Sequence, residues 1–291
     1  MKYYLQLMRP ANLVTAIADI LAGLSLSKFI FSTDTLSIQT IILLCISTVG
    51  LYGGGVVFND VFDAELDAIE RPERAIPSGK VSKQNATILG VLLLGIGIFC
   101  ASMVSFESMI IAFLVAVLAL VYDKFGKHHA FLGPINMGLC RGGNLLLGMS
   151  VMMSSLQEFW WIGIIPVLYI AAITMVSRGE VHGGNQSILY FAGFLYLIVS
   201  ISQIIMSYQF GNLFITLPFV FLHIFLIFKP LIVAIQNPIG PNIGKAVKAG
   251  VLALIVMDAA WVSACGNFQL AIGVLLLLPL SIKIAKIFAV T

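Results

Sequence analysis

The chain has 291 residues, of which 60% are apolar and only 10% are charged, and its mean hydropathy is +1.05. A water-soluble domain of this size needs more polar surface, so the composition predicts a membrane protein. The net charge of +3 does not indicate nucleic-acid binding, and the four cysteines are isolated in apolar segments rather than arranged as a disulfide framework. We expect no cleavable signal peptide, because the apolar run after Arg9-Pro10 has no small-residue cleavage site.

Apolar segments follow one another along the whole chain, joined by mostly short loops. Those long enough to cross a hydrocarbon core of about 30 Å lie at 11–32, 38–59, 84–106, 130–153, 158–177, 187–208, 210–228, 245–264 and 267–289. A shorter segment at 108–122 spans if the bilayer thins or the helix stands upright. We therefore expect one all-α domain over 1–291, a polytopic bundle of nine to ten transmembrane helices.

The lysine and arginine residues are distributed asymmetrically among the loops. With the N-terminus placed in the cytoplasm, fourteen of the sixteen fall on the inner side, Lys28 lies toward the outer side and Arg141 is mid-span. This positive-inside pattern predicts a multi-pass protein of the cell inner membrane with a cytoplasmic N-terminus. The loops at 60–83, 123–129 and 178–186 then form a cytoplasmic cap.

The most informative segment follows the second predicted span. Asp60, Asp63 and Asp67 stand at i, i+3 and i+7, which places them on one side of a helix. Crowded carboxylates need a cation, and oxygen ligands without a nearby His or Cys favour Mg²⁺, which binds carboxylates together with substrate phosphate oxygens. At a membrane surface this pattern predicts a site for a diphosphate on a lipid tail. The alternative is a solvated acidic loop.

Several segments together resemble one known family. They are the run Asn-Asp-x-x-Asp-x-x-x-Asp from Asn59, the stretch 70–82 that follows it, Arg9-Pro10-Ala-Asn12, the region 122–133, and Arg141-Gly-x-Asn144. In these segments the chain resembles the UbiA superfamily of intramembrane prenyltransferases, and within it the EboC-like branch. The resemblance implies a helical bundle around a central cavity, in which Mg²⁺ holds a prenyl diphosphate whose tail occupies a tunnel open to the lipid.

The resemblance also implies roles for particular residues. Asp60, Asp63 and Asp67 would bind the metal, and polar or basic side chains would support the metal or the diphosphate. These supporting residues are Asn12, Asn59, Arg71 and, as weaker candidates, Arg74 and Lys80. Lys127 lies on the same cytoplasmic face and could also reach a diphosphate. For the lysines, anchoring at the membrane surface is the alternative. Pro77-Ser78-Gly79 is typical of a turn, with Ser82 able to cap the next helix.

The chain departs from the family where a second acidic motif is expected, after the sixth span. That place contains Arg178, Glu180 and His182, with one carboxylate instead of a pair. Glu180 could bind a metal or pair with Arg178, and His182 could coordinate, act as a base or donate a hydrogen bond. Either the enzyme works with one firmly held Mg²⁺ and Arg178 supplies part of the missing charge, or the scaffold binds prenyl lipids with lost or altered chemistry.

Three ionisable residues lie deep within predicted spans: Asp19, Arg141 and Asp258. Charges inside a bilayer are costly and normally face a cavity or a partner. Asp19 and Arg141 lie at similar depth, so we expect them to face the cavity, with Asn144 one turn from Arg141. A pair that only locks two helices together is the alternative.

These observations predict an enzyme that transfers a prenyl group from a prenyl diphosphate to an unidentified small-molecule acceptor in the lipid membrane, with Mg²⁺ as cofactor. Asp60, Asp63, Asp67, Glu180 and His182 are the candidate catalytic residues. The alternative is a catalytically altered prenyl-lipid carrier or transporter. A lipid-phosphate transferase of the CDP-alcohol type is disfavoured because its spacing of Gly and Arg between aspartates is absent.

Overall fold

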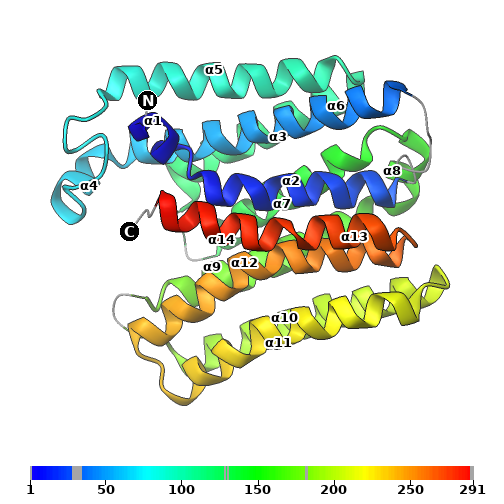
Figure 1. Ribbon diagram of the computed structural model, residues 1–291. Helices are drawn as coiled ribbons and strands as arrows, with labels where there is room; N and C mark the ends of the chain where they lie inside the picture. Colours follow the sequence, from blue (N-terminus) through cyan, green and yellow to red (C-terminus); the bar gives the residue numbers. More distant parts are fainter. Residues whose placement is uncertain (1, 28–34, 128, 130, 181–182, 289–291) are drawn as a thin grey trace.

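The computed structural model describes residues 2–27, 35–127, 129, 131–180 and 183–288, which form a bundle of helices running roughly side by side (Figure 1). The helices of the first half are α1 (Lys2–Leu7), α2 (Pro10–Leu26), α3 (Thr35–Phe62), α4 (Ala64–Glu70), α5 (Lys83–Ser102), α6 (Phe106–Val121), the π-helical turn η2 (Tyr122–Gly126) and α7 (Leu132–Met149). The helices of the second half are α8 (Met153–Phe159), the 3₁₀ turn η3 (Trp160–Gly163), α9 (Ile164–Ser177), α10 (Gln186–Gln209), α11 (Leu213–Gln236), α12 (Gly240–Ala264), α13 (Phe268–Leu275) and α14 (Leu277–Ile287).

The all-α fold agrees with the sequence analysis, but the number of clear spans is smaller than predicted. Among the described residues, eight helices are long and apolar enough to cross a membrane. Two predicted spans fall outside this group: α2 has only 17 residues, and α7 carries Arg141 and Asn144, which lower its hydropathy. The short predicted segment at 108–122 is one of the eight, because its helix continues through η2 to Gly126.

Small residues allow α2 and α7 to pack closely in the interior. A Cβ atom built on Gly23 would lie 2.3 Å from the Leu145 carbonyl oxygen, and one built on Gly148 would lie 2.6 Å from the Ile20 carbonyl oxygen. Glycine at both positions therefore brings the two backbones together, as small residues do at helix interfaces in membranes. Because polar residues lie on the same two helices, this close packing also fixes the distance between the polar residues of α2 and those of α7.

Helix α12 lies inside the bundle, where it packs against α2, α9, α11 and α13. Within its most apolar window, 72% of the residues are buried, compared with 17% for the α13–α14 segment. The apolar surface of α13–α14 is therefore left for lipid. A charged residue in this buried part of α12, such as Asp258, must instead find its partners within the protein.

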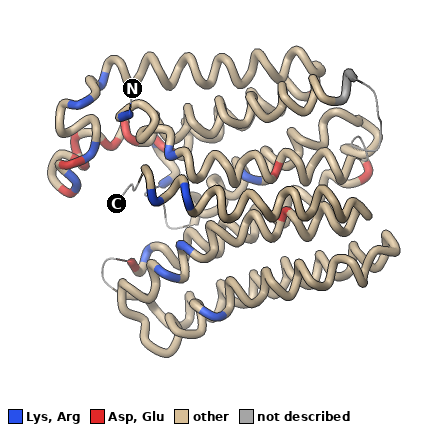
Figure 2. The backbone as a smooth tube through the Cα atoms, in the orientation of Figure 1, with Lys and Arg blue, Asp and Glu red and all other residues tan. Residues whose placement is uncertain are grey.

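The charged residues gather at one end of the bundle, shown on the left in Figure 2. This charged end includes the N-terminus, α4 and the loops that lead from α4 into α5. In that loop Gly79 has a φ of +72°, and Ser82 accepts a hydrogen bond from the Asn85 backbone N–H at 3.1 Å. The predicted turn and the predicted helix cap at Ser82 are thus confirmed.

Candidate functional site

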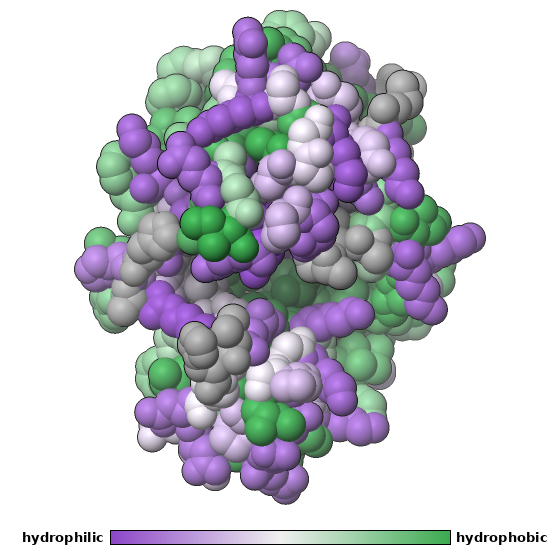
Figure 3. Space-filling model, turned by 90° about the vertical axis from the view of Figure 1, so that its left-hand side faces the viewer, coloured by the Kyte–Doolittle hydropathy of each residue, from purple (hydrophilic) through white to green (hydrophobic). Residues whose placement is uncertain are grey.

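A pocket of about 300 Å³ opens toward the charged end and is lined by α2, α3, α6, η2, α7, α9 and α12. Figure 3 shows this end of the molecule, with a hollow near its centre surrounded by hydrophilic groups. Most of the pocket wall is apolar, with residues such as Leu51, Val115 and Ile173, while Arg9, Asn59 and Asp123 line it as well. The pocket thus combines a polar opening with an apolar interior.

The three predicted metal ligands lie at this opening, but not on one continuous helix. Helix α3 ends at Phe62, and Asp63 takes a non-helical conformation (φ −86°, ψ 0°) before α4 begins at Ala64. The prediction of a single helical face is therefore wrong at Asp63. Among the described residues, no three His, Cys, Asp or Glu side chains are close enough together to hold a metal ion.

Arginine side chains instead bridge two of these carboxylates. Arg9 Nη2 lies 2.9 Å from Asp60 Oδ1, and Arg74 Nη1 lies 2.7 Å from Asp67 Oδ2 and 3.4 Å from Asp60 Oδ1. Asp60 and Asp67 are 9% and 4% exposed, so both depend on these donors for charge compensation. Arg74, a weaker candidate in the sequence, is thus in direct contact with two of the predicted metal ligands.

The third carboxylate is paired with a lysine from a distant part of the chain. Lys127, which follows η2, donates from Nζ to Asp63 Oδ1. This contact brings the predicted candidate Lys127 into the same group of charges as the aspartates. We call the six residues Arg9, Asp60, Asp63, Asp67, Arg74 and Lys127 the mouth cluster.

Arg9 has an unusual backbone as well as a central position in the mouth cluster. It is the only non-glycine residue with positive φ (48°) among the described residues, and it directly precedes Pro10, the first residue of α2. A left-handed conformation at such a residue costs roughly 1–2 kcal/mol and persists only where the surroundings enforce it. The sequence analysis did not include Arg9 among the site residues, although its position before a helix-starting proline was a usable signal.

Asn59 and Asp123 connect α3 with η2 at the pocket wall. Asn59 Nδ2 donates to Asp123 Oδ1 at 2.9 Å, while Asp123 Oδ2 is buried without a hydrogen-bond partner among the described residues. Asp123 also interacts electrostatically with Lys127 and Asp63. An unpartnered buried carboxylate oxygen beside the mouth cluster is a ready ligand for a cation or a hydrogen-bond donor.

The mouth cluster and its neighbours fit Mg²⁺ in their chemistry. Four carboxylates and the Asn59 side chain supply hard oxygen atoms, which this ion prefers, and the unpartnered Asp123 oxygen shows that the set has unused capacity. In the structure, basic side chains provide the compensating positive charge. A metal ion would have to replace part of this pairing, leaving the arginine and lysine side chains for an anionic ligand.

The described residues of the second predicted motif, up to Glu180, form no ion pair with the mouth cluster. Arg178 Nη2 donates to the His129 carbonyl oxygen at 3.0 Å and has no ion pair with Glu180. Partial burial raises the pKa of the Glu180 carboxyl, and the positive charge of Arg71 opposes this shift. Arg71 is therefore close enough to Glu180 to interact with it electrostatically. His182 is outside the described residues. Asn12, by contrast, lines the pocket.

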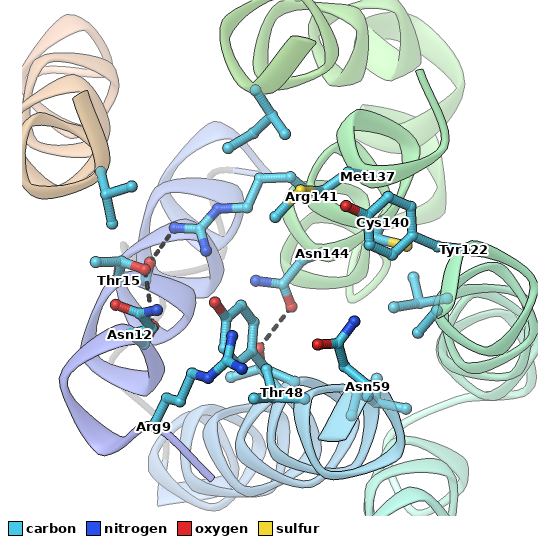
Figure 4. A pocket seen from close by; sticks show the side chains of 18 of the residues that line it. Arg9, Asn12, Thr15, Thr48, Asn59, Tyr122, Met137, Cys140, Arg141 and Asn144 are labelled. Atoms are coloured by element: carbon cyan, nitrogen blue, oxygen red, sulfur yellow. Dashed lines mark hydrogen bonds between the residues drawn. The ribbon is translucent and has the colours of Figure 1, made fainter. Parts of the chain in front are cut away.

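A second polar group lies deeper in the pocket (Figure 4). Arg141 Nε lies 2.6 Å from Asp19 Oδ2, and Asn144 Nδ2 donates to the same Asp19 oxygen at 2.8 Å. Thr48 Oγ1 donates to Asn144 Oδ1 at 2.7 Å. We call Asp19, Arg141, Asn144 and Thr48 the buried network. Asp19 and Arg141 form a pair, and Arg141 and Asn144 line the pocket. Asp19 is completely buried and is not among the lining residues, so the expectation that it faces the cavity is not met.

The fold and the site are those of a polytopic α-helical membrane protein with a charged opening above an apolar pocket. The model of the UbiA prenyltransferase family matches residues 20–249, and the chain belongs to this family. The predicted all-α polytopic fold and the predicted resemblance to the UbiA prenyltransferases are thereby confirmed, whereas the predicted nine to ten spans are not.

Known relatives give a more detailed comparison. The chain is 32% identical over 180 residues to a digeranylgeranylglyceryl phosphate synthase of Saccharolobus solfataricus, a match that covers 61% of each chain. It is 33% identical over 144 residues to the enzyme of the same name from Methanothrix thermoacetophila, covering 50% of this chain and 52% of the relative. The chain thus spans between about half and three fifths of these relatives' lengths. Neither relative supports the EboC-like branch.

Among solved structures, a UbiA homologue of Archaeoglobus fulgidus bound to GPP and Mg²⁺ has a TM-score of 0.58 and 15% identity to the chain. The match covers 87% of this chain and 99% of the homologue. At this identity the likeness shows a shared fold. The likeness agrees with the all-α bundle and assigns no role to individual side chains.

Proposed function

We propose that the protein transfers a prenyl group from a prenyl diphosphate to an acceptor within the membrane, with Mg²⁺ as cofactor and the charged end facing the cytoplasm. The observation that carries this proposal is the mouth cluster, in which acids and bases alternate above an apolar pocket. Carboxylates can hold a metal, basic side chains can hold a diphosphate, and the pocket can hold an apolar chain. The relatives' names and the GPP-bound homologue point to the same substrate class.

In the proposed reaction the bond between C1 of the prenyl group and the diphosphate oxygen breaks, and its electron pair stays on the diphosphate. A lone pair of the acceptor forms the new bond to C1, and the acceptor proton leaves with the released diphosphate. Mg²⁺, when held by Asp60, Asp63 and Asp67, supplies positive charge beside the leaving group. Arg9, Arg74 and Lys127 exchange their carboxylate partners for diphosphate oxygens and stabilise the charge that develops there.

The pocket walls have their own part in this chemistry. An allylic cation must be kept from water until the acceptor attacks, and an apolar wall excludes water from C1. Leu51, Val115 and Ile173 contribute to this wall, from α3, α6 and α9. Tyr52 and Tyr122 also line the pocket, and their aromatic rings are suited to a neighbouring cation.

The experiment measures two quantities on purified protein with prenyl diphosphates of several lengths: Mg²⁺-dependent binding and diphosphate release in the presence of membrane lipid extract. We expect Asp60→Asn to lower diphosphate release by about 100-fold, as the loss of a group that supports transition-state charge does. Glu158→Gln, which removes an exposed carboxylate in α8, is the matched control and should leave release unchanged. Tight binding without release for every chain length would instead support a prenyl-lipid carrier.

A further inference from the structure

Asp123 has one carboxylate oxygen in use and one left over among the residues that the structure describes. It lies in η2, is only 4% exposed and lines the pocket. Its Oδ1 accepts a hydrogen bond from Asn59 Nδ2 at 2.9 Å, whereas its Oδ2 is buried without a described partner. A carboxylate oxygen buried in this way is costly unless a cation or a hydrogen-bond donor satisfies it. Because Asp123 belongs to the pocket wall, a ligand that enters the pocket can supply the missing contact.

A second carboxylate, that of Asp63, lies close to Asp123 at the end of α3. The Asp63 backbone N–H donates to the Asn59 carbonyl oxygen at 3.0 Å, so Asp63 follows Asn59 by one turn on the same side of the helix. Figure 4 shows Asn59 extending from α3 into the pocket. Since Asn59 also contacts Asp123, the two carboxylates are near enough to repel each other.

Lys127 is the main positive charge for both of these acids. It donates from Nζ to Asp63 and attracts the Asp123 carboxylate through space. Lys127 follows the π-helical turn η2, which is closed by a hydrogen bond from its N–H to the Tyr122 carbonyl oxygen at 3.0 Å. Such turns are rare and occur frequently at functional sites. One ammonium group leaves two carboxylates with excess negative charge, and a divalent cation would balance it.

The two acids fit the coordination preferences of Mg²⁺. This ion binds proteins through one or two carboxylates, keeps several waters and takes substrate phosphate oxygens as further ligands. It therefore does not need the group of three acidic, His or Cys side chains that is absent from the described residues. In the loop after α9, the one described carboxylate is that of Glu180, and the charge that acts on it is that of Arg71.

We propose that Asp123 and Asp63 hold a second divalent cation, with Asp123 Oδ2 as a ligand and Asn59 as the residue that orients the Asp123 carboxylate. This inference rests on the proposed function for the diphosphate that completes the coordination. It assigns to η2 the part expected of the second acidic motif, where the chain has a single carboxylate. Asp63 has two oxygens, so it can serve this cation as well as the one held with Asp60 and Asp67.

The experiment titrates the purified protein with Mn²⁺, a spectroscopic substitute for Mg²⁺, and measures free Mn²⁺ by electron paramagnetic resonance. Titrations are made with and without geranyl thiodiphosphate, a donor analogue that ionises slowly, and Mg²⁺ is then added to displace the bound ions. We expect the wild type to bind two Mn²⁺ ions beside the analogue. Asp123→Asn keeps the size of the side chain and should weaken one of the two ions by about tenfold or more, since even the loss of a group that orients a ligand costs about 10–100-fold in metal affinity.

A lysine variant tests the same site in the opposite direction. Lys127→Met removes the ammonium group that competes with a cation for Asp63 and Asp123. Without the analogue it should therefore tighten Mn²⁺ binding by about two- to fivefold, the worth of a partly exposed ion pair. Lys124→Met removes an equal charge from an exposed side chain and is the matched control, with a smaller change expected.

Further controls keep the outcomes separate. Glu158→Gln, the control for Asp123→Asn, should bind both ions as the wild type does. Thermal unfolding in detergent shows whether Asp123→Asn is folded, and the lysine variants decide the question if it is not. The inference is overturned if Asp123→Asn binds Mn²⁺ as the wild type does, if the wild type binds a single ion beside the analogue, or if Lys127→Met binds Mn²⁺ no better than Lys124→Met. The proposed function fails separately, when this pattern of Mn²⁺ binding is present but no prenyl diphosphate is cleaved with Mg²⁺.

Discussion

The mouth cluster and the buried network use the same kinds of side chain in different surroundings. At the mouth, the paired side chains are between 6% and 27% exposed, and each acid is bonded to a base from another segment. In the buried network, Asp19 is 0% exposed and the Arg141 side chain 6%. Water and ions can replace a partly exposed partner at small cost, whereas separating a fully buried pair leaves an uncompensated charge. The mouth pairs are therefore suited to exchange with ligands, and the buried pair is suited to stay in place.

The largest effect should come from breaking the buried pair. Replacing Asp19 with asparagine removes the carboxylate that pairs with Arg141, so that Asp258 is left as the buried carboxyl that interacts with this guanidinium. We expect this to lower the free energy of unfolding by about 3–5 kcal/mol. Thermal or denaturant unfolding in detergent would measure it.

The double variant Asp19→Asn/Arg141→Gln provides the control for this prediction. Because it removes both charges, its cost should be clearly smaller than the sum of the two single costs. Additive losses would contradict a coupled pair, and the buried network would then have to be regarded as two independent polar residues.

A smaller effect should follow when the buried network is displaced without any change in its charges. Gly148→Ala adds a methyl group 2.6 Å from the Ile20 carbonyl oxygen, between α2 and α7. Forcing these helices apart should lower the free energy of unfolding by about 1–3 kcal/mol.

Gly95→Ala is the matched control for the change at Gly148. A Cβ atom at Gly95 in α5 would meet no atom within 4 Å. Unfolding in detergent should show Gly95→Ala to be neutral or slightly stabilising, since alanine favours a helix. If both variants lost the same unfolding free energy, packing between α2 and α7 would not be the cause of the loss in Gly148→Ala.

The smallest effect on stability should be found at the mouth. Asp63→Asn removes the partner of Lys127, but both side chains retain some contact with solvent, so the free energy of unfolding should change by about 1 kcal/mol or less. Mg²⁺-dependent binding of a prenyl diphosphate should nevertheless fall by about tenfold or more, because a proposed metal ligand is lost. Binding measured by isothermal titration, together with unfolding, tests both parts. A large loss of stability with intact binding would contradict the difference between the mouth cluster and the buried network.

Local sequence patterns predicted the helices and the clustering of charge at one end, because hydropathy and loop charge depend on neighbouring residues. The pairing of Asp19 with Arg141 was also accessible, since an intramembrane charge needs a partner at its own depth. The break at Asp63 was not predicted, because three aspartates at positions i, i+3 and i+7 look the same in the sequence whether or not the helix is interrupted between them.

The partners of the mouth cluster were harder to predict because they depend on tertiary packing. Lys127 reaches Asp63 across 64 residues of sequence, and Arg9 reaches Asp60 across 51. A lysine at a membrane surface looks the same in sequence whether it faces lipid head groups or a carboxylate. Only the packing of α2 and η2 beside α3 distinguishes these cases.

Helix α2 joins the two polar regions, since Arg9 caps its start and Asp19 lies ten residues further along it. A helix transmits an axial shift with little loss, so a ligand that draws Arg9 away from Asp60 would also alter the position of Thr15 and Asp19. Ligand binding at the mouth and the geometry of the buried network would then be thermodynamically linked, so that a change imposed on either one must be felt by the other with the same coupling free energy.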